Sequence, residues 1–163
     1  MNLFIRNLLF TLVVPGAGAV YVPWWILSHQ GSTPTPVAWY AVIFIVMGVA
    51  LYLWCVSLFA SLGRGTPGPW DAPQRFVAVG PYRWVRNPIY ISALLVVIGE
   101  AWLFLSLSLL LYAIVIAIIS HLFVISYEEP TLRRNFGQAY EEYLHTVPRW
   151  IPRAPHNFRH SHS

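Results

Sequence analysis

Two short stretches of the chain carry side chains that could together bind a small zwitterion. The first is the run Arg86-Asn87-Pro88-Ile89-Tyr90, which opens a long apolar segment. Asn is a good N-cap and Pro suits the first helical position, so we expect a helix to begin at Pro88 with Asn87 as its cap. The free N–H groups and positive dipole end of that helix, beside arginine side chains, suit a carboxylate or a phosphate.

The second stretch is the acidic pair Glu128-Glu129, where the apolar segment ends in Tyr127-Glu128-Glu129-Pro130. If the segment crosses the bilayer twice, both stretches lie at the same membrane surface, and an anion-binding helix start faces two carboxylates. Plainer readings stay open. The glutamates could be an acidic helix end beside cytosolic arginines. Arg83 and Arg86 could anchor to lipid phosphate, and Tyr82 and Tyr90 could belong to an aromatic belt at the interface.

Two further ionisable residues, Glu100 and His121, lie inside the apolar segment. Glu100 is about twelve positions into the expected helix, where a carboxyl group is costly unless it is paired or hydrated. His121 precedes Glu128 by seven residues and therefore lies on nearly the same helical face. Either residue could act as a catalytic proton acceptor. The alternatives are a hydrogen bond from Glu100 to a neighbouring helix and a packed, structural His121.

The composition is that of a membrane protein. Of the 163 residues, 57% are hydrophobic and 10% are charged, which is too apolar for an ordinary soluble domain. The ten basic residues are all Arg, and they lie beside apolar segments. The net charge of +4 therefore favours a lipid surface as partner over a nucleic acid. The single Cys55 has no disulfide partner in the chain and no metal-type spacing, so we expect a core residue and no metal site.

The apolar runs predict one all-α, polytopic membrane domain over residues 1–163. Residues 88–125 would form a helix of about 57 Å, too long for one crossing, so we expect a hairpin that turns near Leu105-Ser106-Leu107. After Pro130, apolar residues recur at helical spacing, which predicts an amphipathic helix on the membrane surface. The expected spans are residues 8–27, 37–62, 88–104 and 107–126. Residues 63–86 are the expected cytosolic loop, and residues 127–163 are the expected cytosolic tail.

The arginines also predict the orientation. All of them lie in the N-terminal segment, in the 63–86 loop or in the C-terminal tail. Because cytosolic connections carry the excess of Arg and Lys, four crossings place both termini and that loop in the cytosol. Loops of this length in a compact protein are commonly functional, so we expect the 63–86 loop to cover a bound cofactor.

The run Arg86 to Tyr90, followed by a hydrophobic hairpin and Glu128-Glu129, resembles the Arg-His-Pro-x-Tyr and Glu-Glu signature of integral-membrane methyltransferases. This is the isoprenylcysteine carboxyl methyltransferase and phospholipid methyltransferase superfamily. One departure is Asn87, where the commonest family pattern has His. Asn retains the capping role but supplies no imidazole. The similarity extends over about Gly63 to Arg153, and its other blocks are Gly80-Pro81-Tyr82-Arg83, Arg133-Arg134-Asn135-Phe136-Gly137, Tyr140 and Val147-Pro148-Arg149.

The resemblance implies a methyl donor, S-adenosylmethionine, and a lipid-embedded acceptor such as a prenyl-cysteine carboxylate, a phospholipid amine or a similar apolar molecule. Arg83 or Arg86 would then hold the donor carboxylate, and Glu128 and Glu129 its amino group and hydroxyls. The remaining residues expected to contact the cofactor are Tyr82, Asn87, Pro88 and Tyr90.

The chemistry of the acceptor decides whether Glu100 or His121 is needed as a catalytic base. An amine acceptor must lose a proton, which would give Glu100 or His121 a role as base; a carboxylate acceptor needs none. Two other functions compete with methyl transfer. One is a non-catalytic membrane adaptor that retains the fold, and the other is a reductase related to the sterol reductases, whose chains are much longer. The sequence carries no signal for the oligomeric state.

Overall fold

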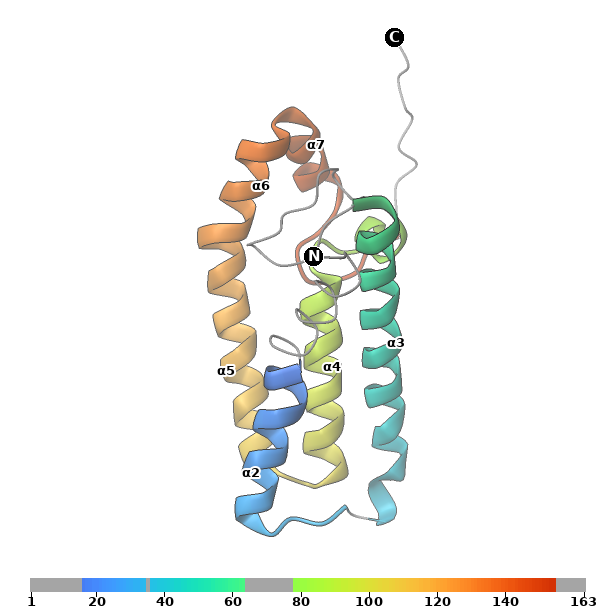
Figure 1. Cartoon of the computed structure of the whole chain (residues 1–163), viewed down its shortest axis with the longest axis vertical. Coiled ribbons are helices and arrows are strands. Elements are labelled where there is room, and N and C mark those ends of the chain that lie inside the picture. Colours follow the sequence, from blue (N-terminus) through green and yellow to red (C-terminus); the bar gives the residue numbers. More distant parts are fainter. Residues whose placement is uncertain (1–15, 35, 64–77, 155–163) are drawn as a thin grey trace.

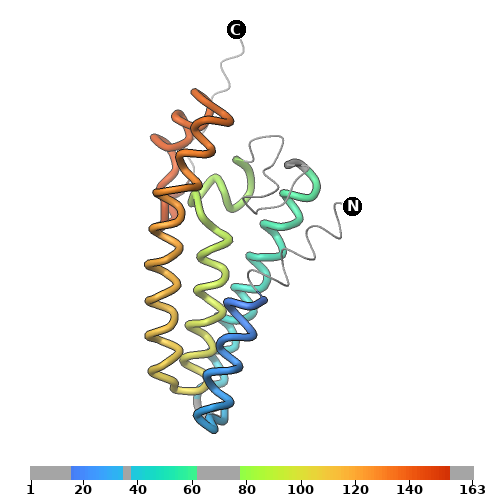
Figure 2. The backbone as a smooth tube through the Cα atoms, turned by 60° about the vertical axis from the view of Figure 1, so that its left-hand side comes forward, coloured from blue at the N-terminus to red at the C-terminus, as the bar shows by residue number. Residues whose placement is uncertain are grey.

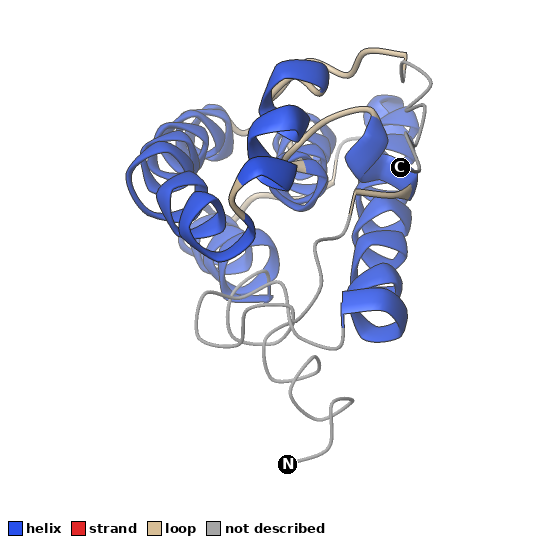
Figure 3. Cartoon of the chain, turned by 90° about the horizontal axis from the view of Figure 1, so that it is seen from above, coloured by secondary structure: helices blue, strands red, loops and turns tan. Residues whose placement is uncertain are grey.

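The computed structural model describes residues 16–34, 36–63 and 78–154, and all regular secondary structure in these ranges is helical (Figure 1). This confirms the all-α prediction for the described part of the chain. Helices α2 to α5 run lengthwise, and the short helices α6 and α7 lie together at one end. Figures 1 and 3 both place α4 between α5 and α3.

The first described helix is α2, Val22–Gln30, which continues from a π-helical turn at Ala17–Tyr21. Within the expected span 8–27 the structure shows helix from Ala17 onward, and residues 8–15 lie outside the described ranges. The helix ends three residues later than expected. Gly31 stops it with a left-handed φ of 61°, a conformation that glycine adopts without the steric cost of a Cβ atom.

Helix α3, Val42–Leu58, is extended by a 3₁₀ turn at Pro36–Ala41 and a π-helical turn at Phe59–Gly63. Its apolar part, Ala38–Ser61, is long enough to cross a bilayer and agrees with the expected span 37–62. The expected cytosolic loop follows, but its residues 64–77 lie outside the described ranges.

Helices α3 and α4 approach each other closely at two glycines. A Cβ atom on Gly48 would lie 2.6 Å from the carbonyl oxygen of Ser92 on α4. A Cβ atom on Gly99 would lie 2.7 Å from Cγ1 of Ile45 on α3. The absent side chains thus permit backbone contact, as small residues commonly do between membrane helices.

Helices α4, Pro88–Leu103, and α5, Leu107–Phe123, form the expected hairpin. The turn is made without glycine or proline. Leu105 adopts a left-handed φ of 48°, and the Ser106 hydroxyl caps α5 by accepting a hydrogen bond of 3.3 Å from the Leu109 N–H. A left-handed residue other than glycine costs about 1–2 kcal/mol, and the cap helps to offset this cost.

The helix that begins with α5 does not end at Glu128-Glu129. A π-helical turn, Val124–Glu128, leads from α5 into α6, Glu129–Phe136, so that Leu107–Phe136 is one continuous helix (Figure 2). Pro130 lies in the first turn of α6. Proline is tolerated there because the wider π turn already interrupts the regular hydrogen-bond ladder.

Gly137, with φ 53°, separates α6 from α7, Gln138–Thr146, and lets α7 fold back beside it. The apolar residues of this segment pack on one another, because Tyr140, Tyr143 and Val147 are buried in one cluster. The partly buried residues around them are Ala78, Leu132, Phe136 and Leu144. The helical apolar spacing after Pro130 therefore builds a small protein core. The expected position of this segment on the membrane surface stays a prediction.

The long helices expose apolar surface to their surroundings. For example, the exposed fraction is 60% for Val46 on α3 and 59% for Ile119 on α5. Among the described residues, Ala38–Ser61 and Leu107–Phe136 are long and apolar enough to span a membrane, and α4 is a shorter apolar helix. Such continuous apolar exposure indicates that lipid surrounds these helices.

Candidate functional site

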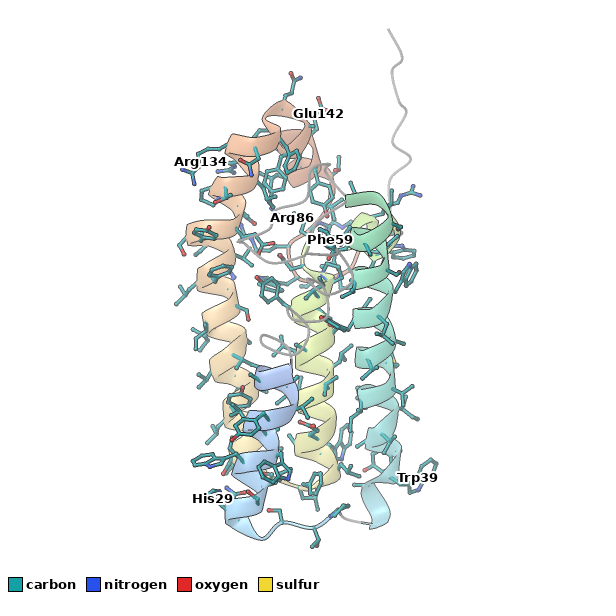
Figure 4. All side chains as sticks on the ribbon, viewed as in Figure 1. His29, Trp39, Phe59, Arg86, Arg134 and Glu142 are labelled. Atoms are coloured by element: carbon teal, nitrogen blue, oxygen red, sulfur yellow. The ribbon has the colours of Figure 1, made fainter. Side chains whose placement is uncertain are left out.

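The site lies where the α4 entrance, residues 86–90, meets the junction of α5 and α6 at Glu128 and Glu129. Before α4, the chain makes a 3₁₀ turn at Gly80–Arg83, in which Pro81 and Tyr82 are buried. Figure 4 shows Arg86 inside the molecule at the same end as Arg134 and Glu142, whereas His29 and Trp39 lie at the opposite end. The labelled arginines and Glu142 thus lie together at one end of the bundle.

Glu129 is buried and held by two arginines. Arg86 Nη1 donates to Glu129 Oε1 at 3.0 Å. Arg149 donates through Nε to Oε1 at 2.8 Å and through Nη2 to Oε2 at 3.0 Å. These hydrogen bonds to Glu129 raise the pKa of Arg149 further. Both oxygens of Glu129 are therefore occupied by the protein itself.

Glu128 has a different environment from its neighbour. The Tyr90 hydroxyl donates to Glu128 Oε2 at 2.8 Å. The structure shows no ion pair between Glu128 and any described arginine, and its Oε1 makes no hydrogen bond within the described ranges. Glu128 is thus a half-buried carboxylate with one oxygen still able to accept hydrogen bonds.

Arg86 also retains a hydrogen-bond donor. Its Nε is buried and has no hydrogen-bond partner among the described residues, although Nη1 is bound to Glu129. A buried N–H of a charged group without a partner is costly, so such a group is suited to an anionic ligand. The arrangement therefore offers a cationic donor and a carboxylate acceptor at the same end of the bundle.

Asn87 does not have the role that its position suggests. It directly precedes α4, but its side chain makes no capping hydrogen bond, which corrects the expectation of an Asn cap. Instead Nδ2 donates to the backbone carbonyl of Arg149 at 3.2 Å. The reason is that the chain after α7 runs past the start of α4 and offers the Arg149 carbonyl there. Pro88 is buried at the first helical position, as expected.

The chain after α7 is bound to the loop before α4 at several points, and we call residues 147–153 the C-terminal strap. The Arg86 N–H donates to the Pro148 carbonyl at 2.9 Å, and the Arg153 N–H donates to the Trp84 carbonyl at 3.0 Å. The strap is thus fixed beside the site by backbone hydrogen bonds as well as by Arg149.

Two tyrosines of α7 complete the polar cluster. The Tyr143 hydroxyl donates to the Tyr82 carbonyl at 2.7 Å. Burial raises the pKa of Tyr143, and it raises the pKa of Tyr140 to about 12. Both phenols therefore stay neutral and keep their protons for hydrogen bonding at physiological pH.

The strap also reaches the membrane helices through Trp150. Its indole Nε1–H donates to His121 Nδ1 at 3.0 Å, and its ring meets Tyr90 edge-on at a centroid separation of 6.2 Å. His121 is thus connected to the cluster through Trp150.

The structure brings together most of the expected cofactor residues: Arg86, Asn87, Pro88, Tyr90, Glu128 and Glu129. Tyr82 contributes its carbonyl, but its ring packs against Phe59 at 5.5 Å and lies beside Cys55. Cys55 itself is fully buried, as expected of a core residue. The structure gives Arg83 no hydrogen bond or ion pair to the cluster.

Glu100 is not brought to the cluster. It lies twelve residues beyond Pro88 on the same helix, about 18 Å along the axis. Its Oε2 is buried and makes no hydrogen bond with the described residues. A catalytic role for Glu100 therefore gains no support from its position.

Four residues of the cluster were not predicted as site residues: Tyr140, Tyr143, Arg149 and Trp150. Arg149 and Tyr140 belong to the blocks that carry the family resemblance, and this was the available signal. Trp150 had none, because its contact with His121 depends on where the strap runs after α7.

Comparison with models of protein families gives a match to the family described as phospholipid methyltransferase, over residues 37–139. This range is more than half of the chain and includes helices α3 to α6. It contains the α4 entrance and both glutamates, and it ends before Arg149 and Trp150. No curated protein and no solved structure matches the chain.

Proposed function

This chain belongs to the phospholipid methyltransferase family, and from that membership we propose that it transfers a methyl group from S-adenosylmethionine to a lipid-embedded acceptor. The family implies methyl transfer to lipid-like substrates. We propose a phospholipid amine as the first acceptor to test, with a prenyl-cysteine carboxylate or a similar apolar molecule as the next.

The observation that carries the donor assignment is a buried N–H without a partner and a carboxylate oxygen that is still available, both among the described residues at one end of the bundle. Arg86 Nε has no partner, and Glu128 Oε1 accepts no hydrogen bond from the described residues. The amino-acid part of S-adenosylmethionine has a carboxylate and an ammonium group, which are complementary to these two side chains. The residues present therefore fit this donor.

The two glutamates have separate roles in this proposal. Glu129 organises the site, because both of its oxygens are bound to Arg86 and Arg149. Glu128 binds the donor, with Tyr90 fixing the orientation of its carboxylate. Asn87 positions Arg149 through the backbone and needs no imidazole to do so. The departure from the commoner His at this position is therefore compatible with activity.

Bound S-adenosylmethionine supplies an electrophilic methyl group on a positively charged sulfur. The sulfur loses its charge during transfer, so a carboxylate in contact with it would stabilise the ground state more than the transition state. We therefore assign Glu128 to the polar part of the donor. The contribution of the protein is to align donor and acceptor and to exclude water, and the strap and the buried tyrosines serve this purpose.

We further propose that the chain forms a single membrane domain with four crossings, with both termini and the site on the cytosolic side. Arg86 and Arg134 lie at one end of the bundle, opposite His29 and Trp39 (Figure 4). That charge distribution agrees with an arginine-rich cytosolic face and an aromatic outer interface. The soluble donor is available on that side of the membrane.

The direct test is label transfer in proteoliposomes that contain phosphatidylethanolamine. Purified protein and S-adenosylmethionine labelled on its methyl group should give radioactivity in the extracted lipid. A parallel set of vesicles with a prenylated cysteine as acceptor tests the second substrate class. A folded protein that neither binds S-adenosylmethionine saturably nor transfers label would favour the adaptor function, because an adaptor needs no donor site.

A further inference from the structure

Trp150 connects the C-terminal strap to both long helices of the hairpin. Its indole N–H donates to His121 of α5, and its ring packs edge-on against Tyr90 of α4, whose hydroxyl holds Glu128. Trp150 lies beyond the residues that match the family model, which end at 139. Its contacts are therefore a feature of this chain that the family match does not assign.

The hydrogen bond between these two side chains defines the protonation form of His121. An indole nitrogen can only donate, so Nδ1 of His121 must accept with a lone pair. A neutral imidazole with a lone pair on Nδ1 carries its proton on Nε2. Protonation of Nδ1 would remove the acceptor and break the hydrogen bond to Trp150.

The second ring nitrogen of His121, Nε2, is then available to a ligand. His121 is half-buried, and within the described ranges the bond to Trp150 is the one hydrogen bond of its side chain. It lies seven residues before Glu128 on one continuous helix, about 10 Å nearer the centre of the bilayer. That depth corresponds to a lipid-borne acceptor approaching a donor held at Glu128.

We propose that Trp150 is a positioning residue that holds His121 with its proton on Nε2, so that His121 donates a hydrogen bond to an oxygen of the acceptor headgroup. In this form His121 does not serve as the base that removes a proton from the acceptor. The role toward the acceptor rests on the proposed methyltransferase function. The tautomer rests on the hydrogen bond alone.

The tautomer can be measured by nitrogen-15 NMR of protein labelled at histidine, in nanodiscs and mildly alkaline buffer. The His121 signal is identified by its loss in His121→Gln. We expect a protonated Nε2 and a hydrogen-bonded, unprotonated Nδ1. Trp150→Phe keeps an aromatic ring but removes the N–H, so it should shift the Nδ1 signal and allow both tautomers. The matched control Trp84→Phe alters an exposed side chain and should leave the signal unchanged.

A second measurement distinguishes donation from base catalysis. Glutamine can accept from Trp150 and donate to the acceptor, but it cannot take up a proton. We therefore expect His121→Gln to retain label transfer within about threefold, whereas loss of a general base costs about 10²-fold or more. His121→Leu, which can make neither hydrogen bond, should raise the KM for the acceptor and leave S-adenosylmethionine binding unchanged.

Two NMR results would overturn the inference: a proton on Nδ1 of His121 in the wild-type protein, or a His121 signal that is unchanged in Trp150→Phe. A hundredfold loss of turnover in His121→Gln with donor binding intact would also overturn it. Failure of the wild-type protein to bind S-adenosylmethionine would instead overturn the proposed function. These failures are distinguishable because the NMR measurement requires neither donor nor turnover.

Discussion

At the scale of the residue, two adjacent glutamates have different partners, and the proposed function gives them different roles. Glu129 is enclosed by Arg86 and Arg149, whereas Glu128 is bound by one tyrosine and keeps an oxygen available. The sequence offers a pair of equivalent acids, whereas in the proposed function one carboxylate organises the site and the other binds the donor. The division depends on Arg149, which comes from twenty residues further along the chain.

Arg149 should therefore matter for donor binding. In Arg149→Gln, Glu129 keeps only Arg86, and hydrogen bonds to charged groups contribute about 1.5–3 kcal/mol. Because the Arg149 side chain is 32% exposed, we expect the lower part of that range, a loss of about tenfold in S-adenosylmethionine affinity. Equilibrium binding of the radiolabelled donor measures this.

The matched control is Arg134→Gln, since Arg134 is exposed and its side chain bonds only to Thr131 among the described residues. Equal affinities in both variants would show that Arg149 does not organise the site.

Asn87 gives a second prediction at this scale. The Asn87→His variant places an imidazole N–H where the amide now donates to the Arg149 carbonyl, so thermal stability and donor affinity should stay close to wild type. Asn87→Leu removes the donor and leaves the carbonyl without a partner, at a cost of about 1 kcal/mol or more. Thermal unfolding in detergent compares the two, and an Asn87→Leu protein as stable as Asn87→His would contradict the role given to the amide.

At the scale of the element, the site depends on the close contact between α3 and α4. The α4 entrance carries Arg86 to Tyr90, and α3 supports it through the packing of Tyr82 on Phe59 and Cys55. Gly48 and Gly99 let the two backbones touch further along the helices. A substitution in this contact, although it lies away from the site, should therefore lower the stability of the protein.

Gly48→Ala tests this contact. Its Cβ would lie 2.6 Å from the Ser92 carbonyl oxygen, so the helices must separate, with an expected loss of about 1–3 kcal/mol. Gly18→Ala is the control, because the nearest atom to its Cβ is the Tyr112 hydroxyl at 3.9 Å, an ordinary contact. Urea or thermal unfolding in one detergent ranks the variants. A Gly48→Ala protein as stable as Gly18→Ala would contradict the close packing.

The elements were largely predictable from the sequence, and the exceptions have physical reasons. Long uncharged runs predicted α3, and the Asn-Pro step predicted the first residue of α4. Two features could not be read in this way. The hairpin turn uses a left-handed Leu105, which no residue preference indicates, and the helix continues through Pro130 because a π-helical turn precedes it. The conformational preferences of single residues predict neither the left-handed Leu105 nor the continuation of the helix through Pro130.

The site was predictable where it depends on local sequence and not where it depends on the path of the chain. The α4 entrance and both glutamates belong to recognisable motifs, and the hairpin brings them to the same end. Arg149, Trp150 and the use of Asn87 depend on the strap, which returns to the site only after α7 has folded back at Gly137. Periodicity cannot predict such a return.

At the scale of the whole molecule, the bundle has a polar end, where the site lies, and an opposite end that carries the connection between α2 and α3 (Figure 1). Its lateral surface is apolar, as expected for helices in contact with lipid. The proposed orientation places the polar end in the cytosol, where the donor is dissolved, while the acceptor stays in the bilayer.

Cysteine labelling tests this orientation. The native Cys55 is fully buried, so it should give little background with a membrane-impermeant maleimide. Thr33→Cys lies in the exposed connection after α2, and Glu142→Cys lies on the exposed face of α7. In intact cells the Thr33→Cys protein should label, and the Glu142→Cys protein should label only after the membrane is opened. Labelling of both from the same side would contradict the three crossings that the proposed topology places between them.

The central claim is that one donor molecule binds between Arg86 and the free oxygen of Glu128. The most direct measurement is the equilibrium binding of radiolabelled S-adenosylmethionine to purified Glu128→Gln protein, with Glu142→Gln as a control carboxylate on the exposed face of α7. We expect saturable binding by the wild-type and Glu142→Gln proteins and a loss of affinity of at least tenfold in Glu128→Gln, which no longer carries a charge for the ammonium group. Equal affinity in all three folded proteins would contradict the claim.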